Sequence, residues 1–406
     1  MDDIYLNLNN MKNRFTRYLS LAVLAIGIFF TSCTNEDDPE IINTENTVFM
    51  YFPWSTNLTR FFYNNIKDME SNICKMGGLA NDRMIVFMST SSTEAVMYEI
   101  VYKNGKCSHI PIGSYTDYPF TTEQGLTQLF HNVKTYAPAK NYSMIIGCHG
   151  MGWLPVNESM AFYSSEKYHY EYDNGDSLTR YFGGIEWKYQ TDISTLSKAL
   201  GNAGLKMEYI LFDDCYMASI EVAYELKDVT KYLIASTCEV MAYGMPYATI
   251  GKYLLGTPDY KAVCDEFYRF YSNYSLKPYG TLSVTDCSQL DDMAAIMKHI
   301  NTNYRFDERK IEEIQRLDGY SPAIFFDYGD YVKNILKDNN AETDIADAFY
   351  RQLNKTVPFK TNTEKYYTTN CGPLPITTYS GITTSDPSTS PKATCKIHTK
   401  WYYATH

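Results

Sequence analysis

The sequence predicts an α/β fold: an α/β/α sandwich with a mostly parallel central sheet, followed by a C-terminal α+β extension. From about Val48 onward, short apolar runs alternate with amphipathic stretches. Strands separated by helices need crossover connections, which make the sheet largely parallel and place helices on both of its faces. The runs predicted as strands are 48–52, 83–88, 97–103, 142–148, 207–213 and 232–236. The stretches with apolar residues at helical spacing are 57–69, 122–136, 193–203 and 219–226.

A second part of the chain begins near Pro258, with helices predicted at 259–274, 291–303 and 307–317 and a strand at 280–286. Between about residues 153 and 192 the periodicity is lost, and loops of that length are usually functional. We therefore expect four segments. They are a signal peptide (1–32), an acidic tether (33–46), a main domain (47–300) that contains the insertion at about 153–192, and a C-terminal subdomain with a loop-rich tail (301–406).

Composition excludes two classes of protein. The chain carries 36 Lys and Arg against 47 Asp and Glu, a net charge of −11, whereas a nucleic-acid binder needs a basic stripe. With 45% hydrophobic and only 20% charged residues the chain is not disordered. We expect a globular monomer with no nucleic-acid partner.

The N-terminus has the pattern of an export signal. Lys12, Arg14 and Arg17 precede the apolar run 19–30, which is short for a membrane span. The run ends at Ser32 and Cys33, a pattern that resembles a bacterial lipobox, in which Cys33 would be acylated. Ordinary signal-peptidase cleavage is the alternative. The acidic residues after Cys33 resemble the export signal of Bacteroidetes lipoproteins. The expected location is therefore the outer membrane, on its periplasmic or cell-surface face, through a lipid anchor rather than a spanning helix.

Ten cysteines in an exported chain raise the question of disulfides. Most of them lie inside apolar runs, where a buried free thiol is the simplest expectation. Cys371 and Cys395, both in the tail, are the one pair for which we consider a bridge.

Two predicted strands end in residues that could do chemistry. One delivers His149, followed by Gly150 and Gly152, and another delivers Cys215 after Asp213 and Asp214. The carboxyl ends of parallel strands form the crevice where reactive groups collect. A helix starting directly behind Cys215, together with His149, would favour the thiolate. The pair suggests a Cys/His dyad. Two alternatives are a buried structural cysteine and a metal site, for which the ligand spacing is poor.

The segments HGMGW (149–153) and FDDCYMASIEVAYEL (212–226) resemble the two catalytic motifs of the clostripain family of cysteine peptidases. Further matches at 232–236, 244–247 and 282–286 follow in the order of that family, so the resemblance covers most of residues 47–300. It implies a caspase-like fold.

Carried over position by position, the resemblance implies that Cys215 is the nucleophile and His149 its acid and base. The amides of Gly150 and Cys215 would form the oxyanion hole. Asp213 would bind the Arg or Lys side chain of a protein or peptide substrate, with Glu239 a candidate second acid, for which a surface role is the alternative. No cofactor is expected to be required. Ca²⁺ is a possible cofactor that is implied only by the family resemblance.

Departures from the family pattern leave the specificity open. Asp214 occupies a position that is usually small, Tyr216 replaces a leucine, and the first strand lacks the usual acidic turn. The extra acid could neutralise a base, strengthen the preference for basic residues, or face the opposite side. The alternative function is a silent or weakly active lipoprotein that binds peptides or glycans. Autolysis between His149 and Cys215, at Lys167, Arg180 or Lys188, is a further expectation.

Overall fold

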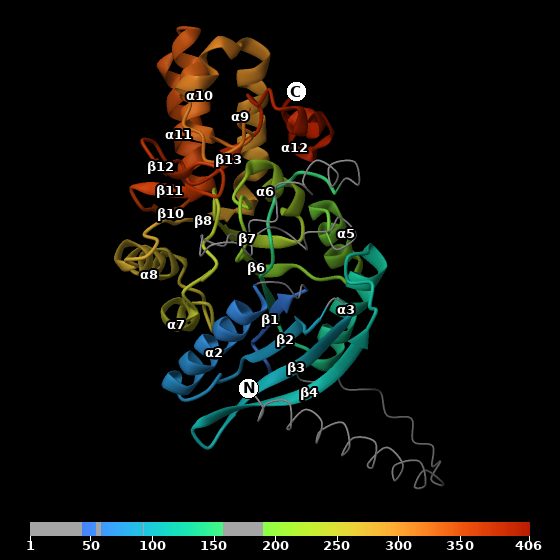
Figure 1. Cartoon of the computed structure of the whole chain (residues 1–406). Coiled ribbons are helices and arrows are strands. Elements are labelled where there is room, and N and C mark those ends of the chain that lie inside the picture. The colour runs from blue at the N-terminus through green and yellow to red at the C-terminus, as the bar shows by residue number, and fades with distance from the viewer. Residues whose placement is uncertain (1–42, 54–57, 92, 157–189) are drawn as a thin grey trace, which may run out of the picture. The chain divides into compact units, whose positions relative to one another are not determined.

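The computed structural model describes residues 43–53, 58–91, 93–156 and 190–406, and residues from Ile42 to the C-terminus form one compact unit (Figure 1). A nine-stranded sheet runs through this unit in the order β10-β8-β7-β6-β5-β1-β2-β3-β4. Expectations that concern the signal peptide, Cys33, the insertion and its Lys167, Arg180 and Lys188 lie outside the described residues or almost wholly so. Within the described part of the chain, no helix has both the length and the apolar character needed to cross a membrane.

Five central strands of the sheet are parallel, as the sequence predicts. They are β1 (Asn46–Phe52), β2 (Arg83–Ser89), β5 (Asn141–Ile146), β6 (Met207–Phe212) and β7 (Thr230–Ala235). Antiparallel strands extend the sheet at both edges. They are β3 (Glu94–Lys103) and β4 (Lys106–Thr116) on one side, and β8 (Thr281–Asp286) and β10 (Phe359–Asn362) on the other.

Helices cover both faces of the sheet, which confirms the predicted sandwich (Figure 1). Alternate residues of β1 enter opposite cores, Phe49 on one face and Met50 on the other, because successive side chains of a strand point to opposite sides. Met50 packs with residues of α2 (Thr59–Met76), α7 (Tyr247–Ile250) and α8 (Tyr260–Asn273). The core on the Phe49 side also contains residues of α3 (Glu123–Tyr136), α5 (Ile193–Asn202), α6 (Ile220–Leu226) and α9 (Leu290–Asn303).

The C-terminal part packs on the main body and supplies strand β10 to its sheet. Helix α9 spans the boundary that we expected after residue 300. The tail continues as irregular chain with short elements. These are β9 (Phe326–Asp327), α10 (Tyr328–Asp338), α11 (Thr343–Thr356), β11 (Lys365–Thr368), β12 (Gly372–Pro375), β13 (Thr383–Thr384), the 3-10 helix η7 (Pro391–His398) and α12 (Lys400–Thr405).

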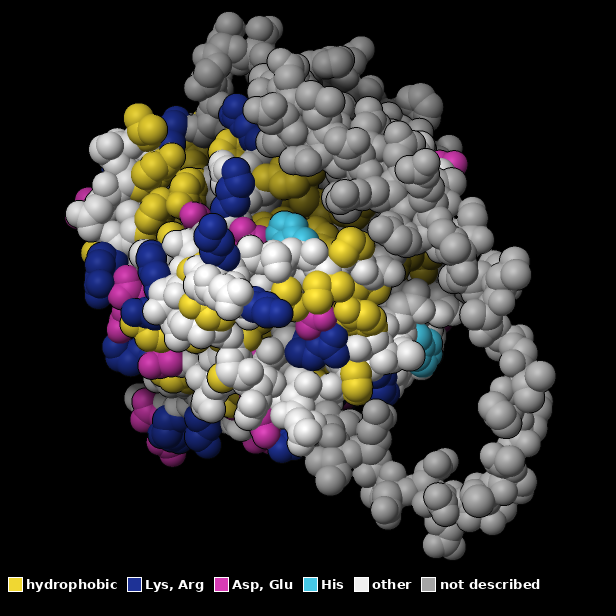
Figure 2. All heavy atoms as spheres, turned by 90° about the horizontal axis from the view of Figure 1, so that it is seen from below, with side chains coloured by type: hydrophobic (Ala, Val, Ile, Leu, Met, Phe, Trp, Pro, Cys, Tyr) yellow, Lys and Arg dark blue, Asp and Glu magenta, His cyan; other side chains and the backbone are white. Residues whose placement is uncertain are grey.

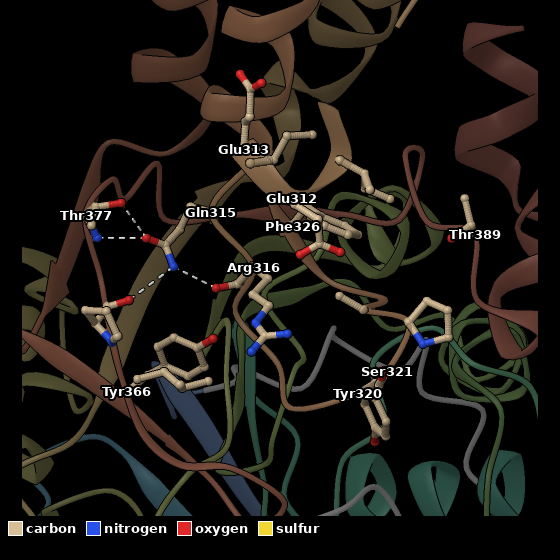
Figure 3. Close-up of a pocket in the computed structure, with 16 residues that line it drawn as sticks. Glu312, Glu313, Gln315, Arg316, Tyr320, Ser321, Phe326, Tyr366, Thr377 and Thr389 are labelled. Carbon is tan, nitrogen blue, oxygen red and sulfur yellow. Dashed lines mark hydrogen bonds between the residues drawn. The ribbon is translucent and has the colours of Figure 1, made fainter. Parts of the chain in front are cut away.

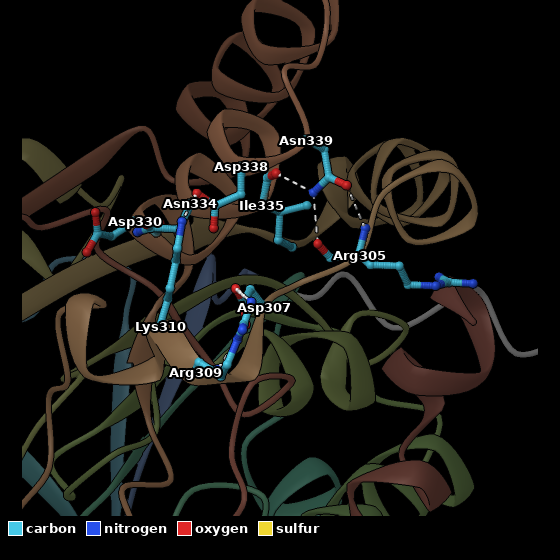
Figure 4. A network of polar contacts seen from close by, with 9 residues as sticks. All are labelled: Arg305, Asp307, Arg309, Lys310, Asp330, Asn334, Ile335, Asp338 and Asn339. Atoms are coloured by element: carbon cyan, nitrogen blue, oxygen red, sulfur yellow. Dashed lines mark hydrogen bonds and ion pairs between the residues drawn. The ribbon is translucent and has the colours of Figure 1, made fainter.

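The helix predicted at 307–317 is wrong in type and length, since the structure has only the 3-10 helix η6 (Glu308–Glu313) there. Its C-terminal half is extended instead, because Leu317 donates its N–H to Phe325 and Arg316 bridges to Phe326. Polar contacts tie this segment to α10 (Figure 4). Lys310 pairs with Asp338 at 2.5 Å, and nearby Asn339 Nδ2 donates to Arg305 O at 2.8 Å.

Charged side chains of both signs are interspersed on the face of the molecule that Figure 2 shows. Lys and Arg side chains lie close to Asp and Glu side chains there, with apolar side chains between them, and they do not gather into a single basic patch.

Candidate active site

The register of the sheet brings the two motif segments together. Strands β5 and β6 are parallel neighbours, and Ile146 pairs with Phe212 at their carboxyl ends. His149 and Cys215 each lie three residues beyond that pair, so the two residues leave the same edge of the sheet on adjacent strands. The strand that carries His149 ends at Ile146 rather than at Cys148, two residues earlier than predicted.

Gly150 is in direct contact with the backbone of Cys215. A Cβ atom at Gly150 would lie 2.3 Å from the carbonyl oxygen and 2.7 Å from the nitrogen of Cys215, distances that real Cβ atoms do not adopt. Only glycine at position 150 therefore permits the two segments of the chain to approach this closely. The contact places the amides of both residues, the predicted oxyanion hole, within one small volume.

The Cys215 thiol is 1% exposed, and its Sγ accepts the backbone N–H of Val240 at 3.2 Å. His149 is fully buried as well. The helix predicted at 219–226 is confirmed as α6, but it begins at Ile220, five residues after Cys215 rather than directly behind it, and Ser219 caps it by accepting the N–H of Val222. A donor to Cys215 Sγ thus comes from the loop after β7 rather than from the N-terminus of α6.

Asp213 and Asp214 are both buried and turn to different partners. The Asp213 carboxylate accepts the Met245 N–H at 2.9 Å and the Tyr247 hydroxyl at 3.3 Å. The Asp214 carboxylate accepts the Cys148 N–H at 2.6 Å, and its other oxygen lies 3.6 Å from the Cys148 thiol. Of the three possibilities for the extra acid, the structure favours the one in which Asp214 faces away from Asp213.

Tyr216, which departs from the family pattern, contacts Glu239, the candidate second acid. The Tyr216 hydroxyl donates to Glu239 Oε1 at 2.8 Å, and Glu239 also accepts the N–H and hydroxyl of Thr369 in the tail. Glu239 is 8% exposed, so the surface role considered for it is wrong. Tyr216 has a φ of +61°, a left-handed conformation that is uncommon for a tyrosine and that turns the chain away directly after Cys215.

Residues of the C-terminal part contact both motif segments, and no local sequence pattern predicted these contacts. Phe325 stacks on Tyr216 with ring centroids 5.0 Å apart, and it also fills the space in front of Gly152. The indole nitrogen of Trp153 donates to Ser385 Oγ at 2.8 Å. The need of a buried indole for an acceptor was the one available hint, but it could not identify Ser385.

Ser385 connects the two motifs through a buried acid. Its N–H donates to Glu221 Oε1 at 2.7 Å, and the Thr384 hydroxyl donates to the same oxygen at 3.2 Å. Burial, together with the nearby Asp386, raises the pKa of Glu221 to about 7, against the hydrogen bonds that lower it. The tail thus holds Trp153 of the first motif and Glu221 of the second.

A cavity of about 430 Å³ lies in the C-terminal part, next to this site (Figure 3). Charges of both signs line it, from Glu312, Glu313 and Arg316, and Gln315 accepts the N–H of Thr377 at its rim. Tyr320 lies at its lower side, with its ring centroid 6.0 Å from that of Tyr216. The cavity is therefore separated from the residue after Cys215 by the ring of Tyr320.

Comparison with known proteins now decides the family. A family model described as the clostripain family matches residues 50–370, most of the chain. The chain belongs to the clostripain family. Its members are cysteine proteases, so the chain is a cysteine protease with a caspase-like fold. This membership favours the enzyme over the silent binding lipoprotein.

Solved structures of clostripain-family proteins resemble the chain. A secreted C11 cysteine protease from Bacteroides thetaiotaomicron, "iotapain", is 56% identical, with a TM-score of 0.81, over 89% of this chain and 99% of its own. A clostripain from the same species, solved with the peptide inhibitor BTN-VLTK-AOMK, is 61% identical, with a TM-score of 0.54, over 56% of this chain and 99% of its own. An inactive zymogen C11 protease from Parabacteroides distasonis shares the fold at 24% identity, with a TM-score of 0.74, over 90% of this chain and 99% of its own. No curated protein matches the chain.

Proposed function

We propose that the chain is an endopeptidase that cleaves peptide bonds after Arg or Lys through a dyad of Cys215 and His149. The observation that carries this proposal is the contact between Gly150 and the Cys215 backbone at the ends of two paired strands. That contact brings the His149 segment against the Cys215 segment, which is the arrangement that nucleophile and base need.

In the proposed reaction, the Cys215 sulfur attacks the scissile carbonyl while His149 takes the thiol proton. The amides of Gly150 and Cys215 donate to the oxygen on which negative charge develops. His149 then gives its proton to the departing amine, and a thioester remains on Cys215. Water, deprotonated by His149, attacks the thioester and restores the thiol. No step uses a cofactor. A Ca²⁺ requirement is a prediction from family resemblance, and assays with and without a chelator test it.

The preference for basic residues is assigned to Asp213. A buried carboxylate that is already oriented by Met245 and Tyr247 offers a fixed acceptor for a guanidinium or ammonium group. The inhibitor bound to the 61% identical clostripain is written VLTK, with lysine last in the peptide. This supports Lys before the cut bond. Glu239 adds a second negative charge beside Tyr216, while its hydrogen bonds also hold Thr369.

We propose export with a lipid on Cys33, at the outer membrane, for the mature monomer. The description of the 56% identical relative as secreted supports export. Cell fractionation of the wild type and of Cys33→Ala tests the anchor. Retention of both in the membrane fraction would contradict it.

Activation by autolysis is the last element of the proposal. His149 and Cys215 are 0% and 1% exposed in the uncut chain, which supports a latent form that cleavage opens. Wild-type protein should become cut between these residues on incubation, and Cys215→Ala protein should stay intact. Cleavage of Cys215→Ala at the same rate would assign the cut to another protease.

The function is tested with fluorogenic peptides that end in Arg, Lys or Asp before the reporter group. Cys215→Ala should abolish turnover of the Arg and Lys peptides, and the Asp peptide should not be cut. Asp213→Asn keeps the acceptor for Met245 but removes the charge, so it should lower kcat/KM for the Arg and Lys peptides about 100-fold. An unchanged ratio between basic and acidic peptides in Asp213→Asn would assign the preference to another residue.

A further inference from the structure

Two thiols outside the active site lie side by side. Cys74 belongs to the last turn of α2, and Cys107 is the second residue of β4, 33 positions later. Their Sγ atoms are 3.6 Å apart, and both side chains are half-buried. This pair differs from the one considered from the sequence. The thiols of Cys371 and Cys395 contact the carbonyls of Gly319 and Lys392 instead of each other.

The surroundings hold the two elements in place around the thiols. One turn before Cys74, the Glu70 carboxylate pairs with the His109 ring, and the Cys107 thiol lies 3.6 Å from the Glu70 carbonyl oxygen. His109 stacks on Tyr98 of β3 with ring centroids 4.3 Å apart. Helix and strand are therefore already fixed to each other beside the pair. A disulfide has its sulfurs about 2.05 Å apart, so bridging needs a closure of about 1.5 Å, within reach of rotation about the two Cα–Cβ bonds.

A metal site explains the pair less well. Zinc in a structural site takes four ligands, usually Cys and His. Within the part of the chain that the structure describes, no group of three or more His, Cys, Asp or Glu side chains is arranged to hold a metal ion. The carboxylate and ring nearest to the thiols, Glu70 and His109, bind each other.

We propose that Cys74 and Cys107 form a disulfide in the exported protein, which covalently links α2 to the β3–β4 hairpin. The proposal rests on the export proposed above, because a disulfide persists in an oxidising compartment and not in a reducing one. The disulfide would link an edge strand of the sheet to a helix that packs on its central strands. Among the described residues, strand β4 is the edge of the sheet and pairs only with β3, whereas α2 packs on the central strands.

The bond forms by thiol–disulfide exchange with a dithiol oxidoreductase or a small disulfide of the compartment. One thiolate attacks the disulfide of the oxidant and releases one of its thiols, which gives a mixed disulfide. The second cysteine attacks the mixed disulfide and releases the other thiol. The two cysteines lose two electrons and two protons, and the oxidant's disulfide gains them as two thiols. Burial and the adjacent Cys74 raise the pKa of Cys107 to about 12, so Cys107 is a poor first attacker.

The experiment uses the full-length gene in a bacterium that exports the protein. The protein is isolated without reductant, its free thiols are alkylated under denaturing conditions, and its peptides are mapped by mass spectrometry. We expect one linked peptide pair, containing Cys74 and Cys107, that separates on reduction. Cys371 and Cys395 should be alkylated. Alkylation of both Cys74 and Cys107 in this exported protein overturns the proposal, and so does one equivalent of zinc that is lost in Cys74→Ser.

Variants separate the disulfide from other effects. Cys74→Ser and Cys107→Ser should each abolish the link and lower Tm by about 5 °C relative to the oxidised wild type, and reduction should lower the Tm of the wild type but not that of these two variants. Cys371→Ser is the matched control and should change neither. Turnover of the Arg and Lys peptides should stay within about twofold in Cys74→Ser, since neither thiol lies at the active site. A disulfide between Cys74 and Cys107 in a protein that cleaves neither peptide would contradict the proposed peptidase activity and support the disulfide. Cleavage of the peptides by a protein in which both thiols are alkylated would support the peptidase activity and contradict the disulfide.

Discussion

The Asp214 carboxylate accepts the backbone N–H of Cys148 at 2.6 Å. This bond joins the chain directly before Cys215 to the chain directly before His149. An acid that could have disturbed the base or changed the specificity instead connects the two motifs. Its presence at a position that is usually small in the family therefore has a structural explanation.

Two substitutions of Asp214 distinguish the effect of its hydrogen bond with Cys148 from the effect of its negative charge. Asp214→Ala leaves the buried Cys148 N–H without its acceptor, which should cost about 1–3 kcal/mol of unfolding free energy and lower kcat/KM about 10- to 100-fold. Asp214→Asn keeps an oxygen acceptor and should retain most of the activity. Urea unfolding and peptide turnover measure both variants. If Asp214→Asn and Asp214→Ala lost kcat/KM equally, and only for the Arg and Lys peptides, the negative charge of Asp214 rather than its hydrogen bond would be the property that matters.

Gly150→Ala should inactivate the enzyme with little loss of fold. The new Cβ would collide with the Cys215 backbone, so the two strand ends must move apart and the oxyanion hole is lost. We expect kcat to fall about 100-fold or more. Gly201→Ala, where the added Cβ meets only Val229 at 3.9 Å, is the matched control and should keep full activity. If Gly150→Ala cleaved the peptides at close to the wild-type rate, the contact between Gly150 and Cys215 would not be needed for activity.

Tyr216 and Glu239 should be energetically coupled. Tyr216→Phe and Glu239→Gln each remove or weaken a buried hydrogen bond, and the double variant should be less destabilised than the sum of the two by about 1 kcal/mol. Denaturant unfolding of the four proteins gives the coupling energy directly. Additive effects would mean that Tyr216 and Glu239 stabilise the fold independently of each other.

Glu221 should make stability depend on pH. Its pKa of about 7 in the fold exceeds the ordinary value of 4.5, so the folded protein holds a proton that the unfolded chain releases. The fold is therefore favoured below about pH 4.5 and loses about 3 kcal/mol as the pH rises to 7. Glu221 Oε2 has no hydrogen-bond partner among the described residues, so Glu221→Gln is tolerated sterically and should remove this slope. Stability curves of wild type and Glu221→Gln that stay parallel from pH 4.5 to 7 would contradict the assignment.

Local patterns predicted the centre of the sheet and the positions of His149 and Cys215 well. Each central strand is a short apolar run between turns or helices, a signal that lies within a few residues of sequence. Strand β4 escaped prediction because it is a largely exposed edge strand, so its sequence lacks the buried run that marked the others. The helix at 307–317 failed because residues 325–327, far along the chain, pair with its second half.

The partners of the site could not be predicted, since they depend on tertiary contacts. Ser385 lies 232 positions from Trp153, and Thr369 lies 130 positions from Glu239. Nothing in the local sequence of either residue distinguishes it from other tail residues. The Cys74 and Cys107 contact is of the same kind, because it depends on how the end of a helix crosses the end of a strand.

The central claim is that Cys215 is the nucleophile of an enzyme that recognises a basic residue. Labelling the activated protein with Lys- and Arg-terminated irreversible peptide inhibitors, followed by mass mapping of the modified peptide, tests both parts at once. We expect one label per molecule on Cys215, at least tenfold slower labelling in Asp213→Asn, and no label from an Asp-terminated inhibitor. Labelling of another cysteine, or equal labelling by basic and acidic inhibitors, would contradict the account.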